Sequence, residues 1–282
     1  KVSVADDSLN SVLIVGASGR VGRMLARAWA QDGLRPVLQH RSAALPFDLP
    51  QLAWKPGQAA LPRNFDAMIV MAGIVPGKGD LAENTRIAEA CLTAAQEAGI
   101  RQVLIASSSA VYGSNGGKPF CESDALHPVN DYGRAKMAME AACAPFRADG
   151  MQVCALRIGN VAGADALLLN VAAGQRVRVD QFADGAGPLR SYIGPQTMAR
   201  VLASLVGRDL TDALNLAAPT PVAMADLARE SGADWAWQPA PDSAYQNITL
   251  DCSRLSALYG FAPSDSTAQA MVAEWQALRG VA

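Results

Sequence analysis

The sequence predicts an α/β fold in which helices cover both faces of a parallel β-sheet, the doubly wound arrangement. Two observations carry this prediction. Strand-like apolar runs alternate with helix-like patterns through the first 160 residues of the 282-residue chain, and such regular alternation is typical of a doubly wound parallel sheet. The first run, at 12–15, has four apolar residues in succession, as expected of a strand buried on both faces.

The first strand leads into a glycine-rich turn. Glycines at 16, 19 and 22 permit a tight turn, let the backbone approach a diphosphate, and allow close packing of helix against strand. The N–H groups that begin the following helix favour an anionic pyrophosphate. Such a turn also occurs as a plain connector, but its place after a buried first strand favours dinucleotide binding and a Rossmann-like fold. The residues expected to contact the cofactor here are Gly16, Ser18, Gly19, Arg20, Val21 and Gly22.

The second strand, expected at 35–41, ends without an acidic residue. Folds that bind NAD usually place Asp or Glu here to bond the adenosine ribose hydroxyls. This sequence has Gln39, His40 and Arg41 instead. Because a cation attracts a 2′-phosphate that a carboxylate would repel, we expect NADP, with His40 and Arg41 beside it. NAD is the alternative if Arg41 is an ordinary solvated side chain at a strand end.

Two features of the next elements concern the same cofactor. The strand expected at 66–73 ends in Ala72 and Gly73, which are small enough to let a cofactor approach. Asn84 stands near the start of a predicted helix and either bonds backbone beside the cofactor or helps to cap that helix. The other elements expected in this half are strands at 52–54, 101–109 and 153–158 and helices over 81–98 and 132–147.

Beyond residue 160 the pattern becomes less regular, and 164–188 is short of clear strands. We expect a dinucleotide-binding domain over 11–162, to which the chain returns near 196–217. A smaller C-terminal substrate lobe is expected from 163–195 and 218–282. The elements predicted in this half are helices at 197–206, 226–231 and 266–278 and a strand at 213–216.

Composition excludes several classes of function. Half of the residues are hydrophobic and 18% are charged, which predicts a large core and not a disordered chain. The net charge of −2 gives no reason to expect nucleic acid or a membrane surface as a partner, and no apolar run approaches the roughly 18 residues of a membrane span. With two histidines, we expect no metal site. Five cysteines without paired or ligand spacing, and ten first residues without a hydrophobic segment, predict a cytoplasmic protein.

A tyrosine and a lysine four residues apart form a second candidate site. Tyr132 and Lys136 are expected on one face of a helix. A nearby ammonium and a positive nicotinamide ring favour the phenolate and lower its pKa from about 10, so the tyrosine can exchange a proton with a small-molecule alcohol or carbonyl. This pair alone is common on helices. Ser108, however, ends a predicted strand, at the edge where open α/β sheets bind ligands, and its hydroxyl can polarise the same carbonyl.

The order of glycine turn, strand-end serine and Y-x-x-x-K resembles the extended branch of the short-chain dehydrogenase/reductase superfamily, with its NAD-dependent epimerase/dehydratase family. The resemblance covers nearly the whole chain. The segments that carry it are 107–113 (similar to S-S-x-x-V-Y-G), the spacing of Glu122, Pro128, Tyr132, Lys136 and Glu140, then 156–163 (L-R-x-x-N-V-x-G), 190–193 (R-x-F/Y-I) and 251–263 (D-x-S-R/K-L…L-G-x-x-P).

The resemblance implies a role for each matching residue. Tyr132 is implied as the acid/base, Lys136 as the residue that holds the nicotinamide ribose and tunes Tyr132, and Ser108 as the group that orients the substrate oxygen. Ser109 is the rival to Ser108, although the family's spacing favours Ser108. The remaining residues implied are Ser107 at the cofactor and Ser109, Asn160 and Arg190 at the substrate.

Departures from the family narrow the activity. Ser109 and Ala110 stand where dehydratases carry acidic catalysts, which argues against elimination. Ala164 and the segment 194–197 depart from the family near the substrate lobe and weaken any assignment to one nucleotide sugar. We expect an NAD(P)-dependent oxidoreductase or epimerase acting on a carbonyl or secondary alcohol, a nucleotide sugar being one candidate. The alternatives are a 4-epimerase that retains NAD and a non-catalytic dinucleotide-binding sensor or scaffold. As in many relatives, a homodimer is expected through the helices at 81–98 and 132–147.

Overall fold

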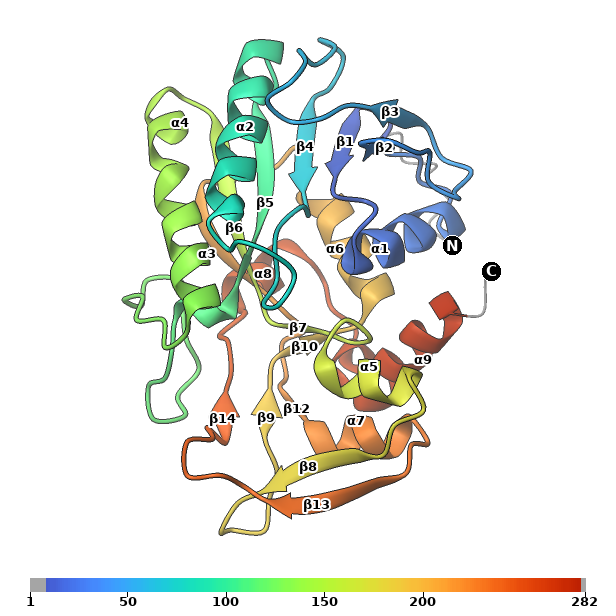
Figure 1. Ribbon diagram of the computed structural model, residues 1–282, viewed down its shortest axis with the longest axis vertical. Coiled ribbons are helices and arrows are strands. Elements are labelled where there is room, and N and C mark those ends of the chain that lie inside the picture. The colour runs from blue at the N-terminus through green and yellow to red at the C-terminus, as the bar shows by residue number, and fades with distance from the viewer. Residues whose placement is uncertain (1–8, 280–282) are drawn as a thin grey trace.

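A parallel sheet of seven strands forms the centre of the computed structural model, which describes residues 9–279 (Figure 1). The strand order is β11-β6-β5-β4-β1-β2-β3, so β1 and β4 flank the point where the order reverses. Sheets of this type bind ligands there, beyond the carboxyl ends of the strands. The strands are β1 (Val12–Val15), β2 (Val37–His40), β3 (Gln51–Ala53), β4 (Ala67–Val70), β5 (Gln102–Ser108), β6 (Gln152–Ile158) and β11 (Asp212–Leu216).

Helices cover both faces of the sheet because its side chains alternate between two apolar cores. In β4, Met68 and Val70 join the core beneath α2 and α3, whereas Ala67 and Ile69 join the core beneath α1 and α6. The doubly wound, Rossmann-like fold predicted from the sequence is therefore confirmed. One face carries α2 (Glu83–Ala98), α3 (Asp131–Ala142) and α4 (Ala144–Ala148), and the other carries α1 (Arg20–Gln31) and α6 (Pro195–Leu205) (Figure 1). The last helix, α9 (Ala268–Arg279), packs against α6 and α7 (Met224–Glu230).

A smaller set of short strands and helices lies beyond the carboxyl ends of the central strands, at the bottom of Figure 1. Three small sheets form it: β7 with β10, β8 with β13, and β9 between β12 and β14. Its elements, with α8 beside β11, are β7 (Asn160–Val161), α5 (Ala166–Ala172), β8 (Val177–Gln181), β9 (Leu189–Arg190), β10 (Tyr192–Ile193), β12 (Val222–Ala223), α7 (Met224–Glu230), β13 (Trp235–Pro239), β14 (Asn247–Ile248) and α8 (Ser253–Leu258).

The structure corrects two expectations about individual elements. The helix predicted over 132–147 is interrupted at Cys143, because Pro145 has no N–H to continue a helix and stands in the first turn of α4 instead. The segment 164–188, expected to be short of strands, holds α5 and the five-residue strand β8. In β8 the buried Val177 and Val179 alternate with more exposed residues, so period-two alternation was present. Among the described residues, no helix is long and apolar enough to cross a membrane.

Candidate functional site

The glycine turn packs tightly against the end of β4. Gly16 has a φ of +89°, and a Cβ atom there would lie 2.4 Å from the backbone nitrogen of Ala72. A Cβ on Gly22 would lie 2.3 Å from the carbonyl oxygen of Gly16. No side chain caps α1, which begins after Gly19, so the N–H groups of its first turn remain available to an anion. A turn with glycines at its closest contacts, followed by an uncapped helix, fits the pyrophosphate of a dinucleotide.

Two adjoining cavities open beside this turn. The first, of about 700 Å³, contains six of the predicted cofactor residues in its lining: Gly16, Ser18, Gly19, Arg41, Ala72 and Gly73. The second, of about 540 Å³, shares Gly19 and Gly73 with the first, so the two cavities are continuous along the turn. Nine more of the predicted site residues line the second cavity: Arg20, Val21, Gly22, Ser107, Ser108, Ser109, Tyr132, Lys136 and Asn160.

Three predicted site residues lie outside both linings. His40 is half-buried, and its Nδ1 is buried with no hydrogen-bond partner in the described structure. Asn84 is buried and bonds the N–H and carbonyl of Ile74 as well as the carbonyl of Leu81, so it fixes the loop after β4. Arg190 uses both Nη atoms on the backbone carbonyls of Leu189, Tyr245 and Gln246.

The predicted catalytic residues come together in the second cavity. Lys136 is buried, and its Nζ donates a hydrogen bond of 2.8 Å to the carbonyl of Ala106 and lies 6.0 Å from the ring centroid of Tyr132. Burial lowers the pKa of Lys136 to about 8, while the Glu140 carboxylate acts in the opposite direction. Ser108, at the end of β5, is hydrogen-bonded to the Tyr132 phenol.

The pKa of Tyr132 differs from the sequence-based expectation. Burial raises it above its ordinary value, and the hydrogen bond from Ser108 only partly opposes that effect. Burial is the larger cause, and the Lys136 ammonium is hydrogen-bonded to the Ala106 carbonyl, with its Nζ 6.0 Å from the centroid of the Tyr132 ring. In the protein alone Tyr132 is therefore a protonated acid, and a bound positive ring would favour its phenolate.

A buried polar network lies next to Lys136 and Ser108, and the sequence did not single it out as functional. Glu140, one turn after Lys136 on α3, accepts hydrogen bonds from Ser107 (2.5 Å) and from the Arg157 guanidinium (2.8–3.2 Å). Arg157 in turn donates to the Tyr112 hydroxyl, which donates to Asn215 on β11. The i, i+4 spacing of Lys136 and Glu140 was the one sign in the sequence that Glu140 lies on the same helix face as the predicted catalytic lysine.

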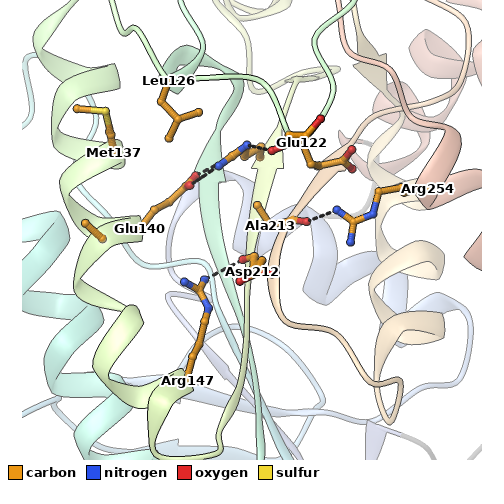
Figure 2. A pocket seen from close by; sticks show the side chains of 11 residues that line it. Glu122, Leu126, Met137, Glu140, Arg147, Asp212, Ala213 and Arg254 are labelled. Atoms are coloured by element: carbon orange, nitrogen blue, oxygen red, sulfur yellow. Dashed lines mark hydrogen bonds and ion pairs between the residues drawn. The ribbon is translucent and has the colours of Figure 1, made fainter.

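The network borders a third cavity, of about 510 Å³, at the β11 edge of the sheet (Figure 2). None of the predicted site residues lines it. Glu140 points into it from α3, while Arg147 and Arg254 reach the backbone carbonyls of Asp212 and Ala213.

Comparison with known proteins identifies the family. A model described as the NAD dependent epimerase/dehydratase family matches residues 12–177, more than half of the chain. The chain belongs to this family. The predicted membership of the extended short-chain dehydrogenase/reductases is thereby confirmed, and the matched segment of this epimerase/dehydratase family member contains the glycine turn, Ser108, Tyr132 and Lys136.

Relatives of two different activities match parts of this family member. The UDP-glucose 4-epimerase of Rhizobium leguminosarum bv. trifolii is 32% identical in an alignment 174 positions long, which covers 55% of this chain and 53% of the relative. The ceramide reductase of Caulobacter vibrioides (strain NA1000 / CB15N) is 37% identical in an alignment 120 positions long, which covers 38% of this chain and 38% of the relative. The chain spans about half, or less, of the length of the curated relatives it matches first.

Solved structures share the fold over nearly the whole chain. The UDP-N-acetylglucosamine 4-epimerase from Bacillus cereus has a TM-score of 0.77 at 16% identity, covering 95% of this chain and 99% of its own. MoeE5 in complex with UDP-glucuronic acid and NAD has a TM-score of 0.74 at 22% identity, with 95% and 99% covered. At these identities the likeness establishes the architecture and not the substrate.

Proposed function

We propose that this protein is an NAD(P)-dependent oxidoreductase or epimerase that acts on a carbonyl or secondary alcohol. The observation that carries the proposal is the cavity in which Ser108, Tyr132 and Lys136 stand beside the glycine turn. A bound dinucleotide supplies or accepts the hydride. The cavity therefore brings a proton donor to the place where a hydride donor would lie.

Each of the three side chains has a distinct task in this proposal. Ser108 donates a hydrogen bond to the substrate oxygen. Tyr132 is protonated in the free protein because burial raises its pKa, and it gives that proton to the oxygen of a carbonyl under reduction, or takes it back in the reverse direction. The Lys136 ammonium holds the nicotinamide ribose and stabilises the phenolate that forms.

We also propose NADP as the cofactor. Arg41 is exposed in the first cavity, and the only carboxylate among the lining residues that the structure describes is Glu83, which an arginine neutralises. An NAD-retaining nucleotide-sugar 4-epimerase is the second candidate, favoured by the partial match to a UDP-glucose 4-epimerase. In both cases the lobe formed by 163–195 and 218–282 binds the substrate, with Asn160 and Ser109 facing it from the second cavity.

Three further proposals concern the protein as a whole. A homodimer through α2 and α3 is proposed because both helices are rich in alanine and lie next to each other on one face of the sheet, where they could pack against the same two helices of a second copy. A cytoplasmic location is supported by five cysteines that are all free thiols. A non-catalytic sensor is the alternative of another class, and full retention of biological function by Tyr132→Phe would favour it.

Mass spectrometry of the dinucleotide released on denaturing freshly purified protein tests the proposal first. Protein that releases none, and whose melting temperature rises more with NADPH than with NADH, behaves as an exchanging reductase. Stoichiometric NAD⁺ would instead favour the epimerase and overturn the preference for NADP. A response to neither dinucleotide would overturn the enzyme proposal itself.

A further inference from the structure

Three cations line the first cavity, and the protein pairs only one of them. Arg86 forms ion pairs with Glu83 and Asp80 on and before α2. Arg41 and Lys55 are exposed, and neither forms an ion pair or side-chain hydrogen bond with any residue from 9 to 279. Two of the three positive charges at this cavity are therefore available to a ligand.

The sheet register brings Arg41 and Lys55 to the same edge. His40, the last residue of β2, pairs with Ala53, the last residue of the parallel strand β3. Arg41 directly follows β2, and Lys55 stands two residues after the end of β3. Because the carboxyl ends of parallel strands lie side by side, the two cations approach the cavity from neighbouring loops.

Gln39 connects these loops to the glycine turn. It is buried, its Oε1 accepts a hydrogen bond of 3.2 Å from the N–H of Gly16, and its Nε2 donates one of 2.5 Å to the carbonyl of Trp54. The buried side chain at the end of β2 is thus a neutral amide whose polar atoms are already bonded. No carboxylate on β2 competes with a ligand phosphate for the two cations.

The backbone that carries Lys55 is held in a tight turn. Pro56 and Gly57 are the central residues of a turn closed by a hydrogen bond from the N–H of Gln58 to the carbonyl of Lys55. Gly57 has a φ of +78°, as a type II turn requires at this position, and proline is favoured at the position before it. The buried Trp54 also bonds the carbonyl of Ala59. The lysine side chain is therefore free while its Cα position is fixed.

We propose that Lys55 and Arg41 form a two-cation clamp for a phosphomonoester on the adenosine 2′-hydroxyl, which makes Lys55 a residue that determines cofactor specificity. The inference rests on the proposed function, because it concerns the dinucleotide of the same site. A phosphate dianion is bound best by two cations that approach it from different sides, the arginine through its planar fork and the lysine as a point charge.

Binding of paired probes tests the clamp. Adenosine 2′,5′-bisphosphate and adenosine 5′-monophosphate differ only in the 2′-phosphate, as NADPH and NADH do. Titration calorimetry of the intact chain is expected to show at least tenfold tighter binding of the 2′-phosphorylated member of each pair. Lys55→Gln is expected to weaken NADPH binding about fivefold, and the double variant with Arg41→Gln to abolish the preference. Binding of NADH stays unchanged in both.

A matched control is Arg63→Gln, which removes an exposed cation that lies outside both cofactor cavities and is expected to leave the NADPH preference intact. Because the Lys55 side chain has no partner to lose, its variant keeps the wild-type melting temperature. An unchanged NADPH-to-NADH ratio in Lys55→Gln would overturn the clamp. Equal binding of NADPH and NADH by the wild type would also overturn it while leaving the proposed function standing, whereas failure to bind either dinucleotide defeats the proposed function.

Discussion

Two cavities lined by cations lie at different places along the sheet, and their cations differ in whether the protein itself pairs them. At the β11 edge, Arg157 is bonded to Glu140, Arg147 to the carbonyls of Val153 and Asp212, and Arg254 to the carbonyl of Ala213 (Figure 2). At the glycine turn, Arg41 and Lys55 bond to nothing in the described structure. Both cavities exceed 500 Å³, so size does not distinguish them.

The difference lies in what the charges accomplish. A sheet edge exposes backbone groups that could pair with another chain, and the side chains of the β11 cavity cover such groups: Arg254 bonds the Ala213 carbonyl, and Glu122 accepts from the Asn215 N–H. Those charges stabilise the fold. Cations that nothing covers are instead available to a ligand. Substitutions at the β11 cavity should therefore change mainly stability, whereas substitutions at the two adjoining cavities beside the glycine turn should change mainly activity or cofactor binding.

The largest effect is expected from Tyr132→Phe. Removal of the phenol hydroxyl deletes the proton donor and the hydrogen bond to Ser108, so turnover should fall about 10³-fold with little change in melting temperature. Steady-state kinetics and a thermal melt of the same preparation measure both. A variant that retains more than about a tenth of wild-type turnover would contradict the role of Tyr132.

The opposite pattern is expected from Arg157→Leu at the β11 cavity. This change leaves the buried Glu140 carboxylate without its cation, and an uncompensated buried charge costs about 3–5 kcal/mol. Urea denaturation measures the loss. Adding Glu140→Gln should recover part of the stability, because the charge is then removed as well. The NADPH-to-NADH affinity ratio should not move, and a changed ratio would show that the two cavities are not independent.

The fold was predictable further than the site was. Alternating apolar runs and Gly16, Gly19 and Gly22 predicted the doubly wound parallel sheet and its glycine turn because those signals are local. The pairing state of a charge is not local. Lys55 forms part of the first cavity only because β2 and β3 lie in register, and Arg157 meets Glu140 across 17 positions of sequence. A single sequence does not reveal which charges are paired.

Activity is expected to depend on pH through Lys136. Burial lowers the pKa of Lys136 to about 8, so the ammonium beside Tyr132 is lost as pH rises through that value. The profile of kcat/KM should therefore show an alkaline limb near pH 8. In Lys136→Arg this limb should disappear, since a guanidinium stays charged to above about pH 12. A flat wild-type profile between pH 7 and 9 would contradict this account.

The same pKa has a consequence for stability. The unfolded chain holds the Lys136 proton up to about pH 10.4, whereas the folded chain releases it near 8. The unfolded state therefore binds more protons between these values, and this residue makes a contribution to stability that rises with pH. Buried cysteines act in the opposite direction, because burial raises the thiol pKa of Cys91 and Cys154 to about 12. The difference in unfolding free energy between wild type and Lys136→Met, measured at pH 7.5 and 9.5, isolates the lysine.

The smallest effect is expected from Arg254→Gln, which tests whether the β11 cavity could be a ligand site after all. Arg254 donates one hydrogen bond to the Ala213 carbonyl and lies partly in solvent, so its loss should cost about 0.5–1 kcal/mol. Glutamine retains a donor and should recover part of that cost relative to Arg254→Ala. Neither variant should alter turnover or NADPH binding. A rise in KM with kcat unchanged would show that Arg254 contacts a ligand. A hydrogen bond from a cation to the backbone would then not be enough to identify a cavity as purely structural.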